Sequence, residues 1–71
     1  MMNQEMIDEA CFDALKKSKP QLLAAIEAGV RLGKTDREIK RTVSQAGASG
    51  LLYQTIVSAL AHIRATVRAR S

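Results

Sequence analysis

The side chains best suited to catalysis or metal binding are few and isolated in this sequence. His62 is the only histidine and Cys11 the only cysteine, and they lie far apart along the chain. A metal site needs several ligands at a recognisable spacing, and covalent catalysis needs a nucleophile beside a base and an orienting group. Neither set can be assembled here. The sequence therefore predicts a non-enzymatic protein with no cofactor, with Cys11 in the core and His62 on the surface.

Lysine and arginine carry the stronger chemical signal, because they are unevenly distributed. Residues 1–30 contain three lysines and five carboxylates, a net charge of −2. Residues 31–71 contain eight lysines and arginines and two carboxylates, a net charge of +6. A positive excess of this size in one half of a small chain indicates a polyanionic partner for that half.

The elements that position these cations are predicted to be helices. Apolar residues recur at helical spacing throughout the chain, and no strand-like alternation is present. We expect an all-α fold, a single small four-helix domain over residues 1–71. Its segments are an acidic amphipathic helix over 1–17, a helix over 20–32, a capped helix over 35–46 and a basic helix over 51–68.

Local signals mark the ends of these helices. Asn3 is a suitable N-cap for the first helix, and Pro20 fits the first turn of the second. Gly33 is a plausible residue for a left-handed C-terminal cap. Thr35 and Glu38 have the spacing of a capping box, in which each side chain bonds the other residue's backbone N–H.

Helical spacing also predicts which side chains form the core. In the first helix these are Met6, Ile7, Ala10, Cys11, Ala14 and Leu15, and its carboxylates are expected at the surface. In the other three helices they are Leu22, Leu23, Ile26, Val30, Ile39, Val43, Leu52, Ile56, Ala59, Leu60, Ile63 and Val67. Since the core is small and no disulfide supports it, we expect a homodimer or a higher oligomer.

The second half has the layout of a helix-turn-helix unit. From Ile26 to Arg64 the predicted order is a helix, a glycine-bearing break, a short capped helix, a glycine-bearing turn and a final helix. The segments Gly33–Ile39 and Tyr53–Ile56, with Gly47 between them and Arg64 after them, resemble helix-turn-helix DNA-binding proteins of plasmids and mobile elements. The turn departs from that pattern, because residues 47–50 form a longer connection than the usual three residues. Leu51 and Leu52 then place two apolar residues at the start of the final helix.

The resemblance implies a duplex-DNA site in which the final helix contacts bases. The expected base contacts are Ser49, Tyr53, Gln54, Thr55 and Ser58, whose amide and hydroxyls suit base edges. The expected phosphate contacts are Lys34, Arg37, Lys40, Arg41 and Arg64. Two of these have structural alternatives. Arg64 equally suits compensation of the helix dipole, and Tyr53 suits a half-buried packing position.

The leading functional hypothesis is a small DNA-binding protein, a transcriptional regulator or a plasmid accessory factor that binds duplex DNA as a homodimer. The alternative is a helical protein-interaction module, an adaptor or inhibitor that docks on an acidic protein surface. The first residues do not resemble a signal peptide, and no apolar segment is long enough to span a bilayer. A cytoplasmic protein with neither a membrane nor a small-molecule partner is therefore expected.

Overall fold

The structure is a computed structural model that describes residues 3–70, and within them the chain forms α-helices and no strands. The helices are α1 (Gln4–Ser18), α2 (Pro20–Arg31), α3 (Asp36–Gln45) and α4 (Gly50–Arg70). The all-α prediction is confirmed. The predicted ranges differ from these bounds by at most two residues, apart from residues 1 and 2, which lie outside the described residues.

The predicted caps of α1 and α3 are present. The Asn3 side chain accepts a hydrogen bond from the Met6 backbone N–H at 2.9 Å. The Glu38 N–H donates to the Thr35 hydroxyl at 3.2 Å, and the Thr35 N–H donates to the Glu38 carboxylate at 3.3 Å. Gly33 ends the α2 region with a φ of +81°, a left-handed conformation that glycine adopts without strain.

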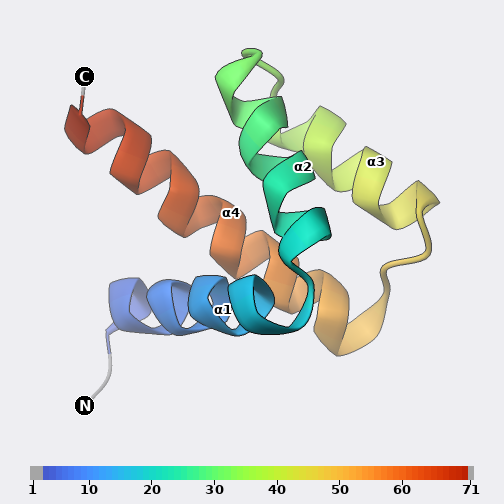
Figure 1. The fold of residues 1–71 in the computed structure, drawn as a ribbon, viewed down its shortest axis with the longest axis horizontal. Helices are drawn as coiled ribbons and strands as arrows, with labels where there is room; N and C mark the ends of the chain where they lie inside the picture. Colours follow the sequence, from blue (N-terminus) through green and yellow to red (C-terminus); the bar gives the residue numbers. More distant parts are fainter. Residues whose placement is uncertain (1–2, 71) are drawn as a thin grey trace.

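Helix α4 lies at the centre of the molecule and contacts each of the other helices, most extensively α1. Figure 1 shows α4 running diagonally, with α1 below it and with α2 and α3 on its other side. The core is formed by Leu15, Leu23, Ile26, Val30, Ile39, Val43, Ile56, Ala59, Leu60 and Ile63. Helix α3 is the shortest helix and lies at the edge of the arrangement.

The predicted buried face of α1 is wrong except at Leu15, since Ala10 and Ala14 are exposed and Cys11 is only partly buried. Met6 is 52% exposed and Ile7 is 39% exposed, whereas Asp8 and Leu15 are buried. The side of α1 that packs on α4 is therefore the one that carries residues 8, 12 and 15, which have the i, i+4, i+7 spacing of a single helix side. Asp8 tolerates this position because the Gln4 amide donates to its Oδ1 at 2.8 Å.

Two further expectations about burial are corrected at α4. His62 is partly buried rather than exposed, because its ring packs against Phe12 of α1 with centroids 4.8 Å apart. Val67 is exposed rather than buried. The buried positions of α4 end at Ile63, and Figure 1 shows its last turns diverging from the neighbouring helices.

Candidate nucleic-acid interface

Three cations of α3 lie on one side of the helix, away from its buried side. Ile39 and Val43 of α3 face the core. On the opposite side lies a group that we call the basic face, which consists of Arg37, Lys40, Arg41, Ser44 and Tyr53. These residues surround a shallow hollow of about 670 Å³. Tyr53 comes from the first turn of α4, so the hollow lies between the two helices.

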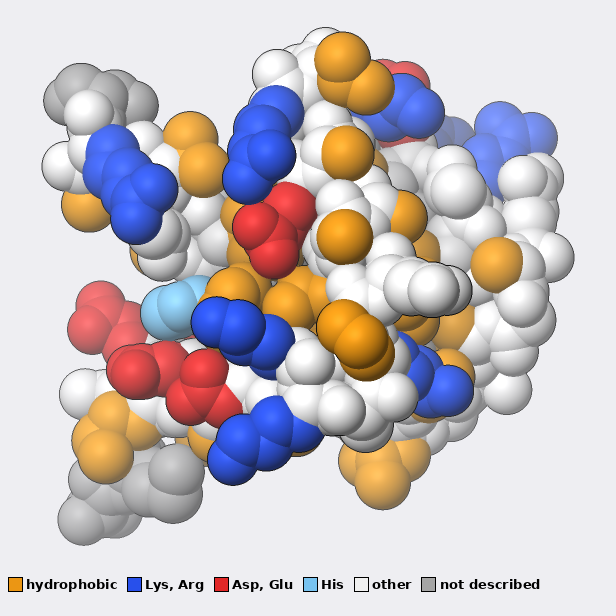
Figure 2. Space-filling model, viewed as in Figure 1, with side chains coloured by type: hydrophobic (Ala, Val, Ile, Leu, Met, Phe, Trp, Pro, Cys, Tyr) orange, Lys and Arg blue, Asp and Glu red, His pale blue; other side chains and the backbone are white. Residues whose placement is uncertain are grey.

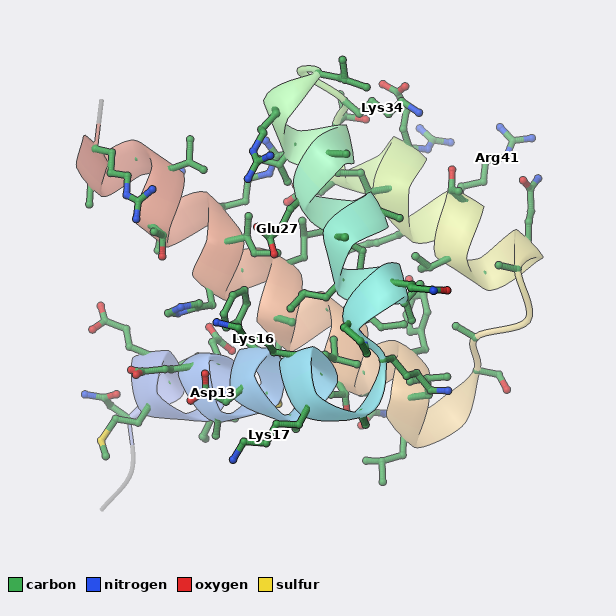
Figure 3. The ribbon with its side chains drawn as sticks, in the orientation of Figure 1. Asp13, Lys16, Lys17, Glu27, Lys34 and Arg41 are labelled. Carbon is green, nitrogen blue, oxygen red and sulfur yellow. The ribbon has the colours of Figure 1, made fainter. Side chains whose placement is uncertain are left out.

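The basic face is separated in space from the acidic part of the chain. Figure 2 shows Lys and Arg side chains standing out over α3 at the upper right, while most acidic side chains on this view lie over the start of α1. Figure 3 shows Lys34 and Arg41 near α3, and on α1 it shows Asp13 together with Lys16 and Lys17 at the end of that helix. The charge asymmetry of the sequence is therefore also a spatial asymmetry.

The cations of the basic face have no acidic partner within the described residues. The ion pairs among residues 3–70 join Arg31 to Glu27 and Arg64 to Asp36. Both carboxylates of α3 are engaged elsewhere, since Glu38 closes the capping box and Asp36 binds Arg64. Arg37, Lys40 and Arg41 thus form no ion pair within the described part of the chain, which leaves their charged groups available to an external anion.

Arg64 connects α4 to the start of α3. Its Nε donates to Asp36 Oδ1 at 2.6 Å, and its Nη2 donates to the Lys34 carbonyl oxygen at 2.6 Å. Two charge-assisted bonds to groups about 30 residues away make Arg64 a clamp that orients α3 on α4. The sequence left Arg64 open between a phosphate contact and compensation of the helix dipole, whereas in the structure its Nε and Nη2 bond groups at the start of α3.

Lys34 also lies apart from the basic face. Its side chain lines a small apolar hollow between α2 and α3, next to Gly29 and Ile39. It remains exposed at the turn before α3. Lys34 therefore flanks the opposite side of α3 from Arg37 and Arg41.

The expected base contacts do not form one group. Thr55, Ser58 and His62 lie at i, i+3 and i+7 on α4, and His62 packs against Phe12, so this side of α4 faces α1. The Thr55 hydroxyl donates to the Leu51 carbonyl oxygen at 2.9 Å. Gln54 is exposed on the outer side of α4.

Ser49 occupies the loop before α4 and is exposed. Its carbonyl oxygen accepts the Tyr53 N–H at 3.4 Å, which places it at the N-cap position. Of the expected base contacts, only Tyr53 lies beside the α3 cations.

Sequence reasoning missed Ser44 as a member of this surface. Ser44 lies three residues after Arg41 and seven after Arg37, which is the spacing of one helix side. That signal was available, but base contacts were expected only on the last helix.

Among residues 3–70, no three His, Cys, Asp or Glu side chains converge as metal ligands would. No helix in the same part of the chain is long and apolar enough to cross a membrane.

Comparisons of the chain with protein-family models, with curated proteins and with solved structures gave no match.

Proposed function

We propose that this chain is a small, non-enzymatic DNA-binding protein whose basic face contacts the phosphates of duplex DNA. The observation that carries the proposal is the set of unpaired cations Arg37, Lys40 and Arg41 on one side of α3. Cations arranged in this way release counterions from a polyanion and gain affinity that depends on salt.

Duplex DNA suits this surface better than a single strand does. Single-strand binding depends on aromatic side chains on which successive bases stack. The chain has only Phe12 and Tyr53 as aromatic residues, and Phe12 packs against His62 inside the molecule. Tyr53 alone remains beside the cations, which is too little for a stacking platform.

The protein would act by occupying its site rather than by chemistry. A cytoplasmic regulator of transcription, or an accessory factor of a plasmid, fits that mode of action and the resemblance noted in the sequence. Phosphate contacts set the position and orientation of such a protein on the duplex without specifying the sequence.

The proposal is tested by removing the three cations together. We expect Arg37→Ala/Lys40→Ala/Arg41→Ala to weaken binding to a short labelled duplex, measured by fluorescence anisotropy at low salt. At about 1 kcal/mol per charged contact, the dissociation constant should rise roughly a hundredfold.

The matched control removes the same charge from the other end of the protein. Lys16, Lys17 and Lys19 are exposed lysines at the end of α1 and the junction with α2, and Lys16→Ala/Lys17→Ala/Lys19→Ala changes the net charge equally. We expect this variant to bind nearly as the wild type does. Equal losses in the two triple variants would contradict a defined basic face.

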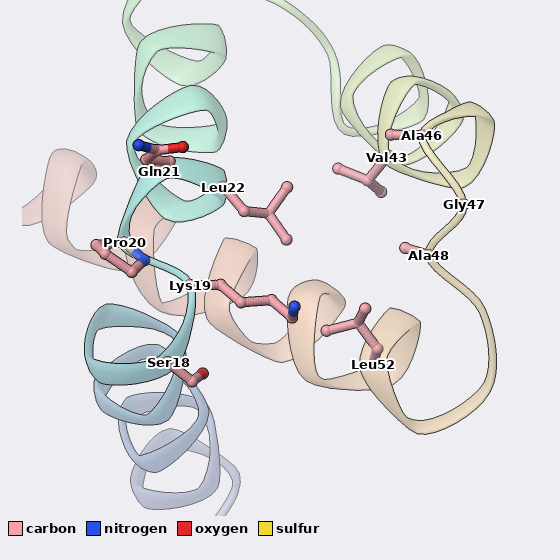
Figure 4. A pocket seen from close by; sticks show the side chains of 10 residues that line it. All are labelled: Ser18, Lys19, Pro20, Gln21, Leu22, Val43, Ala46, Gly47, Ala48 and Leu52. Atoms are coloured by element: carbon pink, nitrogen blue, oxygen red, sulfur yellow. The ribbon is translucent and has the colours of Figure 1, made fainter.

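A second candidate is the protein-interaction module, which is favoured by a different surface. A hollow of about 540 Å³ lies between the α1–α2 junction and the end of α3. Figure 4 shows Leu22, Val43 and Leu52 around it, with the Lys19 side chain extending across it. An acidic segment with apolar side chains would suit this hollow.

If this hollow is the functional surface, the Lys16→Ala/Lys17→Ala/Lys19→Ala variant should no longer bind the protein partner, whereas the Arg37→Ala/Lys40→Ala/Arg41→Ala variant should still bind it.

A further inference from the structure

We infer that α3, rather than α4, is the helix that enters the major groove, with α2 and the turn before α3 as the first half of the helix-turn-helix unit. This inference rests on the proposed function and identifies the residues that would give it sequence specificity. The resemblance to helix-turn-helix proteins instead implies base contacts from α4, so the two assignments make different predictions.

The first argument is that helix α3 is the more exposed of the two candidate recognition helices. Only Ile39 and Val43 of α3 are buried, and the helix lies at the edge of the molecule. Helix α4 is enclosed by contacts with all three other helices. A helix must project from its support to fit a groove about 12 Å wide, and α3 meets that requirement.

The second argument is the connection between α2 and α3. The turn consists of residues 32–35 and contains Gly33 at a φ of +81°, which is compatible with a helix-turn-helix unit, although the connection between α3 and α4 has the same length in the structure and also contains a left-handed glycine, Gly47. The helices approach closely at Gly29, where an added Cβ would lie 3.3 Å from Ile39 Cγ1. Helix α2 thus contacts α3 at Gly29, on the side away from the basic face, while α3 packs more extensively on α4.

The third argument is the chemistry of the exposed side of α3. Arg37 and Arg41 lie one turn apart, and a guanidinium can bond both acceptor atoms of guanine in the major groove. Ser44 continues the same side and can donate to or accept from a base edge. Lys40, whose side chain is partly buried, and Tyr53 flank this row toward α4, where a phosphate backbone would pass.

The alternative reader, α4, presents fewer groups in one direction. Gln54 is exposed and Ser58 follows it by one helical turn, but Ser58 is only partly exposed, and the partly exposed Thr55 donates its hydroxyl to the Leu51 carbonyl oxygen. Of these three residues, Gln54 is therefore the one that is well exposed. Helix α3 instead presents three exposed polar side chains in one row, which are Arg37, Arg41 and Ser44.

The test uses matched serine-to-cysteine changes in the full chain. In a Cys11→Ser background, Ser44→Cys places a thiol on α3 and Ser58→Cys places one on α4. Each is mixed with a duplex that carries an activated disulfide tethered to a major-groove base. The rate of cross-linking is divided by the rate of reaction with the same disulfide free in solution, because Ser44 is exposed and Ser58 is only partly exposed. We expect Ser44→Cys to react about tenfold faster or more, because groove entry raises its effective concentration at the tether.

A second measurement uses the unmodified protein. Backbone amide chemical shifts are followed by NMR during titration with the duplex, and the largest changes are expected at residues 37, 40, 41 and 44. Faster cross-linking at Ser58→Cys, or the largest changes at residues 54, 55 and 58, would overturn the inference and leave the proposed function in place. Absence of any binding to duplex in the anisotropy assay would overturn both.

Discussion

At the scale of single residues, Arg64 is an arginine with a structural role, unlike the arginines of the basic face, which are available to a ligand. Its side chain is 30% exposed, and its guanidinium bonds the side chain of Asp36, which is 52% exposed, and the Lys34 carbonyl oxygen. Partly exposed ion pairs contribute modestly to stability, and the bond to the backbone adds to that contribution. We expect Arg64→Ala to lower the free energy of unfolding by about 1 kcal/mol, measured by urea denaturation.

The control for this change is one turn further along α4. Arg68 is exposed and takes part in no ion pair among residues 3–70, so Arg68→Ala removes the same charge without removing a clamp. It should leave the free energy of unfolding nearly unchanged. If the two variants are equally stable, Arg64 does not clamp α3.

The roles of single residues were only partly predictable from the sequence. Thr35 and Glu38 were recognisable because a capping box depends on residues three positions apart. The pairing of Arg64 with Asp36 was not, because 28 residues separate them and only the packing of α3 on α4 brings them together. For the same reason, a free phosphate-binding role for Arg64 could not be distinguished from a clamp.

At the scale of elements, the N-cap of α3 determines whether the basic face is held in place. The helix has only ten residues, and helices of this length have little stability of their own. We expect Thr35→Ala to lower the free energy of unfolding by about 1 kcal/mol, because the first turn loses its cap. Thermal or urea denaturation monitored by circular dichroism would measure the loss.

Thr42→Ala provides the comparison within the same helix. Thr42 is exposed, and its hydroxyl donates only to the Glu38 carbonyl oxygen, at 3.0 Å. Since the Glu38 carbonyl oxygen lies inside the helix and has a backbone partner there, the loss of the hydroxyl bond should leave this variant as stable as the wild type or slightly more stable. A loss equal to that of Thr35→Ala would show that the cap has no special importance.

The orientation of whole elements was the least predictable feature. Spacing alone identified Ile39 and Val43 as the buried side of α3, because that helix has few apolar residues and they share one side. The apolar residues of α1 are spread more widely, so spacing could not decide between Met6 and Phe12 as core positions. The contact of Phe12 with His62 and the position of α4 settle that choice.

At the scale of the whole molecule, self-association remains a prediction. Leu51 is 80% exposed and follows directly on the loop that borders the hollow lined by Ala48 and Leu52. If a second copy covers this region, Leu51→Ser should weaken the dimer tenfold or more, because burying a leucine contributes about 2 kcal/mol. Sedimentation equilibrium over a range of concentrations would measure the change.

Leu32 makes a matched control for that experiment. It is 76% exposed and lies in the turn between α2 and α3, so Leu32→Ser alters a leucine of equal exposure elsewhere on the surface. The association constant for dimer formation by the Leu32→Ser variant should match that of the wild type. A wild-type protein that stays monomeric at high concentration would refute the expected homodimer.

The central claim, that the molecule binds duplex DNA through unpaired cations, is tested most directly by the salt dependence of wild-type binding. The association constant for one duplex is measured over a series of salt concentrations. If Arg37, Lys40 and Arg41 each neutralise one phosphate, the plot of log association constant against log salt concentration should have a slope of about −2.7 or steeper. A slope near zero, or no binding at the lowest salt concentration, would contradict the claim.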